Sequence, residues 1–414
     1  MIKKRICTIG LGYVGLPLTL SLAKHFEVIG YDNNETRISE LMTDRSRSSK
    51  THPQLKFTSE ISDCEAAQVY IVAVPTPVDE AKQPDFTALE KASEAAASVL
   101  QVGDIVIYES TVYPGATEEI CVPILEKFSG LKYIIDFGVG YSPERINPGD
   151  TVNTLENCVK IVSASDSNTL DVVKAIYDTV VHAGLYPVSD IRTAEAAKII
   201  ENTQRDVNIA LFNELSQIFN LLRIDSKEVF DAAASKWNFH RYTPGLVGGH
   251  CIGVDPYYLT KKALEIGFNP QIILAGRKIN DNMVTYVYDQ IIDLVVDKKF
   301  NLGDVRALVI GSTFKENCPD TRNSKSLELI DKLSQKFSTD VFDPVADYQS
   351  LPDHIKTMTI GKLNKRTYDI IVISVAHSQI IESVDSILEL KRNKDSIIID
   401  LKNILPKEET DFRL

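Results

Sequence analysis

A glycine-rich turn near the N-terminus constrains the fold of this chain more than any other feature of its sequence. Residues 5–9 are largely apolar and β-branched, which predicts a buried strand. The sequence GLGYVG follows directly at residues 10–15 and opens an apolar stretch that predicts a helix as far as Leu22. Glycines at these spacings allow a tight turn from a strand into a helix, as in the first half of a β–α–β unit. We therefore expect the N-terminal part of the chain to form a parallel sheet.

A carboxylate follows this turn at a spacing typical of nucleotide recognition. A second predicted strand, residues 28–31, ends just before Asp32, which lies 22 residues after Gly10. Here the glycines let a pyrophosphate reach the helix N-terminus, and Asp32 accepts hydrogen bonds from the adenosine ribose; because it also repels a 2′-phosphate, we expect NAD rather than NADP. The alternative is a turn that binds nothing, or another nucleotide. The predicted NAD-binding residues here are Gly10, Gly12, Tyr13, Val14, Gly15 and Asp32.

Three further residues are candidates for the cofactor side of the site. Arg37 either supports the adenosine or is a solvated charge on the following helix. Thr76 and Thr111 each lie in a loop that follows a predicted strand. In an open α/β sheet the ligand crevice lies at the carboxyl ends of the strands, so we expect Thr111 to point its hydroxyl toward the nicotinamide. The alternative is that such residues only cap the next helix.

Strands and helices alternate over residues 5–190. A helix is predicted at residues 85–100, with Asp85 as its N-cap. The remaining predicted strands cover residues 69–74, 105–108 and 159–162. Short apolar strands that alternate with helices predict a doubly wound parallel sheet, and we assign residues 1–190 to an NAD-binding Rossmann domain.

The pattern then changes to one long helix and afterwards returns to α/β. Residues 193–222 contain no glycine or proline and carry apolar side chains at helical spacing. A helix of that length is about 45 Å long, which indicates a spine between domains and a dimer interface, with two shorter helices as the alternative. We assign residues 191–300 to a central helical dimerisation domain. The C-terminal domain, residues 301–414, has predicted strands at 307–310, 340–342, 370–374 and 396–400 and a helix at 324–336.

These assignments define the expected fold class. It is α/β, with two Rossmann-like doubly wound domains joined by the long central helix. The C-terminal domain lacks a G-x-G-x-x-G sequence.

Composition excludes several classes of function. Asp and Glu outnumber Lys and Arg by 57 to 45, and this acidic balance argues against a nucleic-acid-binding protein. No apolar run approaches the roughly 20 residues of a membrane span, so we expect a soluble protein with no membrane partner. The six cysteines stand singly, with no metal-ligand spacing, which argues against a disulfide framework or a metal site and favours a reducing, cytoplasmic location.

The most informative candidate for covalent chemistry is Cys251. It lies in the sequence GGHCIGVDP, where flanking glycines such as Gly248 let a substrate approach the sulfur closely. Most single cysteines are small buried side chains, which is the alternative interpretation. Asp255, four residues later, either orients a lysine or water or caps the helix that follows.

Three more polar residues are candidates for the reaction. Lys198 and Asn202 lie one helical turn apart, a spacing that suits an oxyanion, although a solvated lysine beside an asparagine is the simpler explanation. Glu144 lies in a polar loop with two prolines and is a candidate general base, with a surface salt bridge to a neighbouring arginine as the alternative.

Taken together, these segments resemble the UDP-glucose/GDP-mannose 6-dehydrogenase family, and within it the UDP-N-acetylhexosamine branch. The resemblance rests on six ordered motifs over some 320 residues. It implies an N-terminal NAD domain, a central dimerising helix and a C-terminal domain for the UDP moiety. The motifs after the glycine-rich turn are YESTVYPG, GYSPERINPGD, AEAAKIIENTQRDVNIA, PGLVGGHCIGVDPYYL and FKENCPDTRNS.

The resemblance also implies a role for individual residues. The nucleophile of the family falls on Cys251, its aspartate on Asp255 and its glutamate on Glu144. Its catalytic lysine and asparagine fall on Lys198 and Asn202. The implied water-holding residue is Thr111, the residues that bridge substrate and NAD are Lys315 and Arg322, and further substrate contacts are Arg145, Arg241 and Gly248.

The implied activity is an NAD-dependent, two-step oxidation of the C6 alcohol of a UDP-N-acetylhexosamine to the uronic acid, for surface polysaccharide synthesis. UDP-glucose enzymes carry an aromatic residue, a proline and a lysine where this chain has residues 252–254, IGV, which disfavours UDP-glucose as the substrate. The sequence leaves N-acetylglucosamine and N-acetylgalactosamine open. Two alternatives remain, a single-step hydroxyacid dehydrogenase without a thiol and a non-catalytic NAD sensor.

Overall fold

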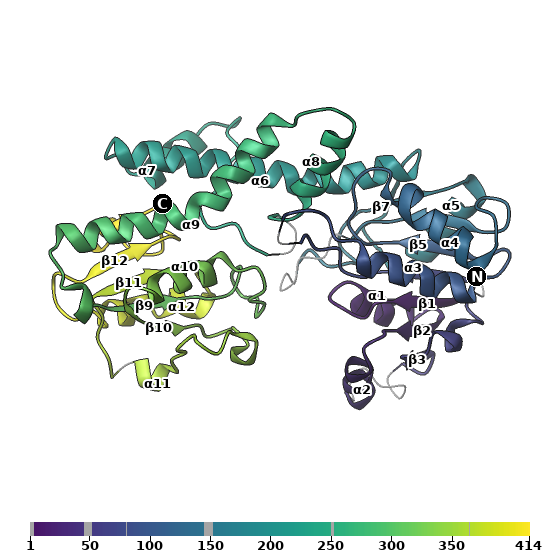
Figure 1. Ribbon diagram of the computed structural model, residues 1–414, viewed down its shortest axis with the longest axis horizontal. Helices are drawn as coiled ribbons and strands as arrows, with labels where there is room; N and C mark the ends of the chain where they lie inside the picture. The colour runs from purple at the N-terminus through teal and green to yellow at the C-terminus, as the bar shows by residue number, and fades with distance from the viewer. Residues whose placement is uncertain (1–3, 45–51, 80, 145–151, 250–251, 364) are drawn as a thin grey trace. The chain divides into compact units, whose positions relative to one another are not determined.

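A computed structural model describes residues 4–44, 52–79, 81–144, 152–249, 252–363 and 365–414 (Figure 1). The chain divides into two compact units, and the division falls inside one long helix. The first unit comprises Met1–Glu201 and Tyr257–Phe268, and the second comprises Asn202–Pro256 and Asn269–Leu414. Within the described ranges, no helix combines the length and the apolar composition that crossing a membrane requires.

The first unit is built on an eight-stranded sheet in the order β3-β2-β1-β4-β5-β6-β7-β8. All neighbours run parallel except β6 and β7, so the prediction of a wholly parallel sheet is wrong at this pair. The described part of the connection between them contains no crossover helix, and β7 therefore starts at the edge where β6 ends. The strands are β1 (Arg5–Ile9), β2 (Glu27–Tyr31), β3 (Leu55–Thr58), β4 (Val69–Val72), β5 (Ile105–Tyr108), β6 (Gly138–Tyr141), β7 (Lys160–Ala164) and β8 (Leu185–Pro187).

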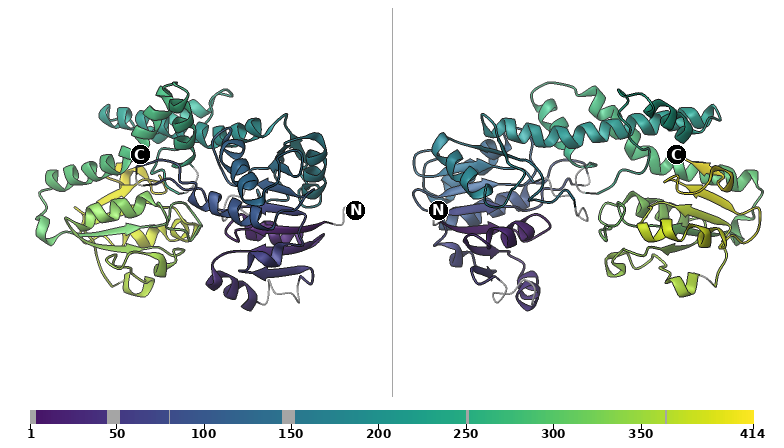
Figure 2. Two further views of the ribbon diagram at one scale, coloured as in Figure 1. Left: turned by 45° about the vertical axis from the view of Figure 1, so that its right-hand side comes forward. Right: turned by 180° about the vertical axis from the view of Figure 1, so that it is seen from behind.

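Helices cover both faces of this sheet (Figures 1 and 2), which is the doubly wound arrangement predicted. Alternate strand residues such as Ile6 and Ile107 face a core shared with α1, α2 and α5. Tyr108 faces the other side, where its hydroxyl lies 2.8 Å from that of Ser93 on α3. The helical segments are α1 (Gly15–Leu22), α2 (Glu35–Thr43), η1 (Ile61–Cys64), α3 (Thr87–Val99), η2 (Thr117–Cys121), α4 (Val122–Ser129) and α5 (Ser167–Tyr177).

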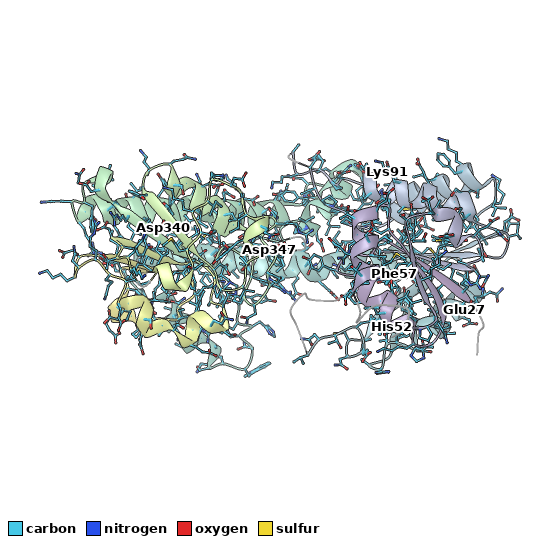
Figure 3. All side chains as sticks on the ribbon, turned by 90° about the horizontal axis from the view of Figure 1, so that it is seen from below. Glu27, His52, Phe57, Lys91, Asp340 and Asp347 are labelled. Carbon is cyan, nitrogen blue, oxygen red and sulfur yellow. The ribbon has the colours of Figure 1, made fainter. Side chains whose placement is uncertain are left out.

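Two details of this sheet show how local sequence and packing interact. Phe57 of β3, labelled in Figure 3, packs on Gly30 of β2, where an added Cβ would lie 2.9 Å from its ring. Asp85 accepts a hydrogen bond from the Thr87 amide at 2.9 Å, but Phe86 occupies the N-cap position of α3. The prediction of Asp85 as the N-cap is therefore wrong by one residue, although its carboxylate still accepts an amide of the first turn.

The second unit has a five-stranded, wholly parallel sheet in the order β10-β9-β11-β12-β13. Helices α9 and α10 pack on one face, and α11, α12 and α13 pack on the other. The predicted strands and the predicted helix of this region are confirmed within one or two residues at their ends. The elements are β9 (Arg306–Ile310), β10 (Ser338–Phe342), β11 (Ile370–Ile373), β12 (Ile397–Asp400), β13 (Phe412–Arg413), α10 (Lys325–Ser334), α11 (Ile360–Leu363), α12 (Ser378–Glu382) and α13 (Val384–Leu388), with short turns η3 (Leu302–Asp304), η4 (Tyr348–Ser350) and η5 (Lys407–Glu409).

The predicted long helix is confirmed as α6 (Ile191–Leu221), which runs for 31 residues without interruption, so the two-helix alternative is wrong. Two shorter helices, α7 (Ser226–Ala234) and α8 (Asp255–Glu265), follow it. A second long helix, α9 (Gln271–Asp297), was not predicted from the sequence. It packs against the part of α6 that belongs to the second unit, where Arg277 forms a buried ion pair with Asp206.

Candidate active site

The register of the first sheet brings several loops to one edge. Ile9 of β1 pairs with Tyr31 of β2 and with Val72 of β4, so the chain leaves all three strands at the same level. Tyr108 of β5 in turn pairs with Val72 and with Tyr141 of β6. The glycine-rich turn, Asp32 and the loops that carry Thr76, Thr111 and Glu144 therefore all start at the carboxyl edge of this sheet, where α/β proteins bind ligands.

The glycine-rich turn has the geometry that a dinucleotide needs. Gly10 has a φ of +93°, and its amide donates to the Tyr31 carbonyl at 2.9 Å. A Cβ on Gly15 would lie 1.8 Å from the Gly10 carbonyl oxygen, so that position also requires glycine. A Cβ on Gly12 would meet nothing within 4 Å, and Val14, at the N-cap of α1, forms no side-chain cap. Open space at an uncapped helix N-terminus fits the pyrophosphate of NAD.

Asp32 and Arg37 both contact the backbone of this turn. The Leu11 amide donates to Asp32 Oδ2 at 2.9 Å, and the half-buried Asp32 also accepts from the Asn34 amide. Arg37 donates through Nε and Nη2 to the Leu11 carbonyl at 3.3 Å. The guanidinium of Arg37 thus lies against the turn rather than being only a solvated helix charge. Tyr13 of the same turn is 52% exposed.

The loops after β4 and β5 are bonded to each other. The Thr76 hydroxyl donates to the Thr111 carbonyl at 2.7 Å, and the Ser110 hydroxyl donates to the Val74 carbonyl at 2.6 Å. Thr111 itself is partly exposed and does not cap the next helical segment, because Ala116 holds the N-cap position of η2. The helix-cap alternative for Thr111 is therefore wrong.

Glu195, which the sequence did not single out, supports the same region from α6. Its buried carboxylate accepts hydrogen bonds from the amides of Gly115 and Thr117, in the loop that follows Thr111. Burial raises the pKa of Glu195 to about 7. Lys198, one turn further along α6, is also buried and belongs to the first unit.

A buried charge cluster surrounds Glu144. Its Oε2 lies 3.8 Å from the ammonium of Lys160, the first residue of β7, and the same ammonium lies 3.3 Å from Glu109 Oε1. All three side chains are at most 9% exposed. Glu144 is therefore not on the surface, and its described ion pair is with a lysine that the sequence did not single out. Arg145 lies outside the described residues.

In the second unit, Asn202 and Asp255 form a direct pair. The Asn202 amide donates to Asp255 Oδ2 at 2.6 Å, and both side chains are at most 2% exposed. Asp255 is the first residue of α8, so a helix N-terminus also stabilises its charge. Asp255 thus starts the helix and accepts a hydrogen bond from an amide, and its predicted role in orienting a lysine or water stays a prediction. Asn202 is one turn after Lys198 on α6 and is buried, so it is not a solvated surface residue.

The loop that precedes Cys251 is held close to the loop that follows β9. Asn323 donates to the Gly249 carbonyl at 2.7 Å and accepts at its own carbonyl from the Gly249 amide at 3.1 Å. A Cβ on Gly248 would lie 2.6 Å from the Asn323 carbonyl oxygen, so this approach requires glycine. Cys251 lies outside the described residues, as does His250.

The remaining predicted substrate residues also belong to the second unit. Arg322 forms a two-point ion pair with Asp320, and its side chain is 57% exposed. The Lys315 ammonium lies 5.7 Å from the ring centre of Phe314. Arg241 pairs with Asp231 at 2.5 Å and is partly exposed. In the ranges described, His, Cys, Asp and Glu side chains form no group of three or more that could hold a metal ion.

Comparison with known proteins covers nearly the whole chain. Family models match three successive segments, residues 4–181, 192–282 and 308–407, described as the NAD binding, central and UDP binding domains of the UDP-glucose/GDP-mannose dehydrogenase family. The chain is 46% identical to UDP-N-acetyl-D-glucosamine 6-dehydrogenase from Pseudomonas aeruginosa, with 99% of each chain covered. It is 47% identical to the protein of the same name from Salmonella typhi, covering 99% of this chain and 98% of the relative.

Solved structures agree with these matches. The structure of UDP-D-ManNAc dehydrogenase from Pyrococcus horikoshii aligns with a TM-score of 0.87 and 29% identity, covering 99% of this chain and 98% of the other. The matched segments include the glycine-rich turn, nearly all of the long helix α6, and strands β10, β11 and β12 of the second sheet. The chain belongs to the UDP-glucose/GDP-mannose dehydrogenase family.

Proposed function

We propose that this protein is an NAD-dependent UDP-N-acetylhexosamine 6-dehydrogenase with UDP-N-acetyl-D-glucosamine as its substrate. The reaction class rests on the buried Asn202–Asp255 pair one helical turn after Lys198 on α6. A cation, an amide and a carboxylate are the kinds of group that stabilise a developing alkoxide or hold a water molecule. The choice of sugar rests on the two full-length relatives at 46% and 47% identity that carry this activity in their names.

The proposed chemistry explains why a thiol belongs in this chain. Oxidation of a primary alcohol to a carboxylic acid removes four electrons in two steps. Bound NAD supplies the hydride acceptor for each step. We assign Cys251 the task of holding the aldehyde between the steps, since its thiolate adds to the carbonyl carbon to form a thiohemiacetal. Loss of hydride from that carbon leaves a thioester, and water then adds and expels the thiolate to leave the uronic acid.

The other residues act on charge and water. Lys198 and Asn202 stabilise the oxyanion that forms in each addition, and Asp255 orients the Asn202 amide. Thr111 helps to hold the water, and Glu144 accepts its proton as the thioester is hydrolysed. Glu144, Arg145, Arg241, Gly248 and Lys315 are the proposed substrate contacts, and Arg322 contacts the cofactor.

We assign residues 1–190 to NAD, 191–300 to dimerisation and 301–414 to the UDP moiety. In support of a homodimer, α6 exposes Leu211, Ile218 and Leu221, which are 48%, 44% and 85% exposed and spaced seven and three residues apart. Such spacing places apolar side chains along one stripe, as in helices that pair with a second helix.

The described cysteines form no disulfide, which supports a cytoplasmic location. The acidic nucleotide sugar would then feed surface polysaccharide synthesis.

The test is a product count. The protein is incubated with NAD and, separately, UDP-N-acetyl-D-glucosamine, UDP-N-acetyl-D-galactosamine and UDP-glucose, and NADH and uronic acid are measured together. We expect UDP-N-acetyl-D-glucosamine to be oxidised fastest, with two NADH per uronic acid. One NADH per product would instead support the single-step hydroxyacid dehydrogenase, and no turnover with any sugar would contradict the proposal.

A further inference from the structure

Four buried polar side chains meet at the carboxyl edge of the first sheet. They are Glu109, directly after β5; Glu144, in the loop after β6; Lys160, at the start of β7; and Tyr177, at the end of α5. Glu109 and Tyr177 are at most 1% exposed. The antiparallel pairing of β7 with β6 is what brings Lys160 to this edge, because Tyr141 at the end of β6 pairs with Ser163 and the start of β7 therefore lies beside the loop that follows β6. None of these groups except Glu144 has a role in the proposed chemistry.

Lys160 is held tightly within this cluster. Its ammonium donates to the carbonyls of Ser142 and Pro143 at 3.3 and 3.2 Å, and it lies 4.9 Å from the ring centre of Tyr177. These two carbonyls belong to the residues just before Glu144, so the lysine restrains the backbone that carries the proposed base. Because the same ammonium lies near both carboxylates, a change of charge on one glutamate alters the electrostatic energy of the other.

The cluster carries one more negative than positive charge when both glutamates are ionised. Among the described residues, Glu109 Oε2 accepts no hydrogen bond, although it is buried. A buried carboxylate oxygen without a donor is costly, whereas a protonated carboxyl removes that charge. Burial raises the pKa of Glu109 to about 7, with the charge of Glu144 acting in the same direction and Lys160 opposing it.

Tyr177 does not compete for this proton. Its hydroxyl donates to Glu109 Oε1, and burial raises the pKa of Tyr177 well above its ordinary value. The tyrosine therefore stays protonated throughout the neutral range. Of the described titratable groups that face one another here from β5, the loop after β6, β7 and α5, Glu109 is the one whose raised pKa lies in the neutral range.

We infer that Glu109 and Lys160 are positioning residues that control the protonation of Glu144, with Glu109 holding the spare proton of the cluster so that Glu144 remains a carboxylate. This inference rests on the proposed function, because Glu144 needs to be ionised only if it accepts a proton from water. Lys160 lowers the energy of the ionised Glu144, and a neutral Glu109 removes the repulsion that would otherwise protonate it.

The two residues should affect the pH profile differently. Glu109→Gln copies the neutral, protonated carboxyl, so the acid limb of uronic acid formation should stay where it is. Lys160→Met removes the cation and should move that limb to higher pH by about one pH unit, the order expected for one charge removed a few ångströms away in a buried site. Lys160→Arg keeps the cation and should restore the limb toward its original position.

Two further measurements keep the test decisive. Glu94→Gln makes the same change of charge on the exposed face of α3 and should leave the limb unchanged. Infrared titration of the unliganded protein should show protonated carboxyls lost as the pH rises through about 7, and Glu109→Gln should remove the share of Glu109 while that of Glu195 remains. Circular dichroism of each variant checks that it is folded.

The outcomes separate this inference from the proposed function. If the unmodified protein makes uronic acid but Glu109→Gln moves the limb to lower pH, or Lys160→Met leaves it in place, the inference is wrong and the function stands. If the unmodified protein makes no uronic acid, the function is wrong, and the infrared titration alone still decides whether Glu109 holds a proton. An infrared signal that Glu109→Gln leaves unchanged overturns the inference in either case.

Discussion

The two units contain the same turn, in which a strand is followed by a glycine with a positive φ and then by an amide that donates to an aspartate. In the first unit, Gly10 follows β1 with a φ of +93° and donates to the Tyr31 carbonyl at 2.9 Å. In the second, Gly311 follows β9 with a φ of +92° and donates to the Phe342 carbonyl at 2.9 Å. In each case the next residue donates its amide to the aspartate that ends the neighbouring strand, Asp32 or Asp343.

The two turns differ in what surrounds the aspartate. Asp32 is half-buried and lies beside open space at Gly12. Asp343 is 2% exposed and accepts further hydrogen bonds from the amides of Thr313, Val345 and Ala346, while the buried His377 lies 3.2 Å away. The same backbone geometry therefore leaves a carboxylate available to a ligand in one unit and uses it to hold loops together in the other. Sequence position alone does not distinguish the two roles.

The largest expected effect comes from removing the buried aspartate. Asp343→Ala leaves several buried amides and His377 without their acceptor, so we expect a loss of about 3–5 kcal/mol in the free energy of unfolding. The affinity for NAD should change less than in Asp32→Ala, since the glycine-rich turn and Asp32 belong to the first unit. Denaturant unfolding and calorimetric titration with NAD measure the two effects, with the exposed Asp353→Ala as the control. A marked loss of NAD binding by folded Asp343→Ala would break the comparison.

The matching change in the first unit should affect binding instead. Asp32→Ala removes a charged acceptor from the ribose, so we expect NAD affinity to fall about 10- to 100-fold and the preference over NADP to relax. The free energy of unfolding should fall by no more than about 1 kcal/mol, because the carboxylate is half-exposed. Fluorescence titration with both cofactors checks the first result, and Glu35→Ala on the exposed start of α2 serves as the control. Equal use of NAD and NADP by the unmodified protein would contradict the role of Asp32.

The buried carboxylates of the two units should respond to pH with opposite sign. Burial raises the pKa of Glu195 to about 7, so its contribution to stability is complete below about pH 4.3 and is lost as the pH rises through about 7. Burial alone would raise the pKa of Asp343, but hydrogen bonds from His377 and Ser312 lower it. Its contribution is therefore complete above about pH 3.9 and is lost as the pH falls below that value.

Two variants isolate these contributions, each on the order of 1–2 kcal/mol. Glu195→Gln should flatten the pH dependence of the unfolding free energy between about pH 4.3 and 7, and Asp343→Asn should flatten it below about pH 3.9. Chemical denaturation over this pH range provides the measurement. If both variants flatten the same pH window, the opposite behaviour of the two units is wrong.

The smallest effect is expected at Arg37. Its two hydrogen bonds to the Leu11 carbonyl are long, at 3.3 Å, and the side chain is 34% exposed. Arg37→Ala should weaken NAD binding about two- to fivefold by loosening the glycine-rich turn, as expected for the loss of a weak hydrogen bond. NADH fluorescence titration resolves a change of this size, and Arg37→Lys should recover only part of it. No change in affinity would mean that the turn holds its shape without Arg37.

Much of the fold follows from short stretches of sequence. The strands β1 and β5, the glycine-rich turn and the uninterrupted helix α6 were predicted because each depends on residues within a few positions of one another. The helix α9 was missed, since it contains Gly276 and many β-branched residues that lower helix propensity. Its packing supplies the missing stabilisation, with Gly276 close against Val207 and Ala210 of α6.

Interactions between distant residues were decided only by the tertiary structure. Residue types and motif spacing singled out Asp32, Thr111, Glu144, Lys198, Asn202 and Asp255 as candidates. Nothing within a few residues of Glu109 or Lys160 indicates that they meet, because their contact depends on the antiparallel return of β7 beside β6. Burial and charge at such a site depend on every element packed around it, so the sequence alone determined which groups are present, and tertiary packing determined which of them lie in contact.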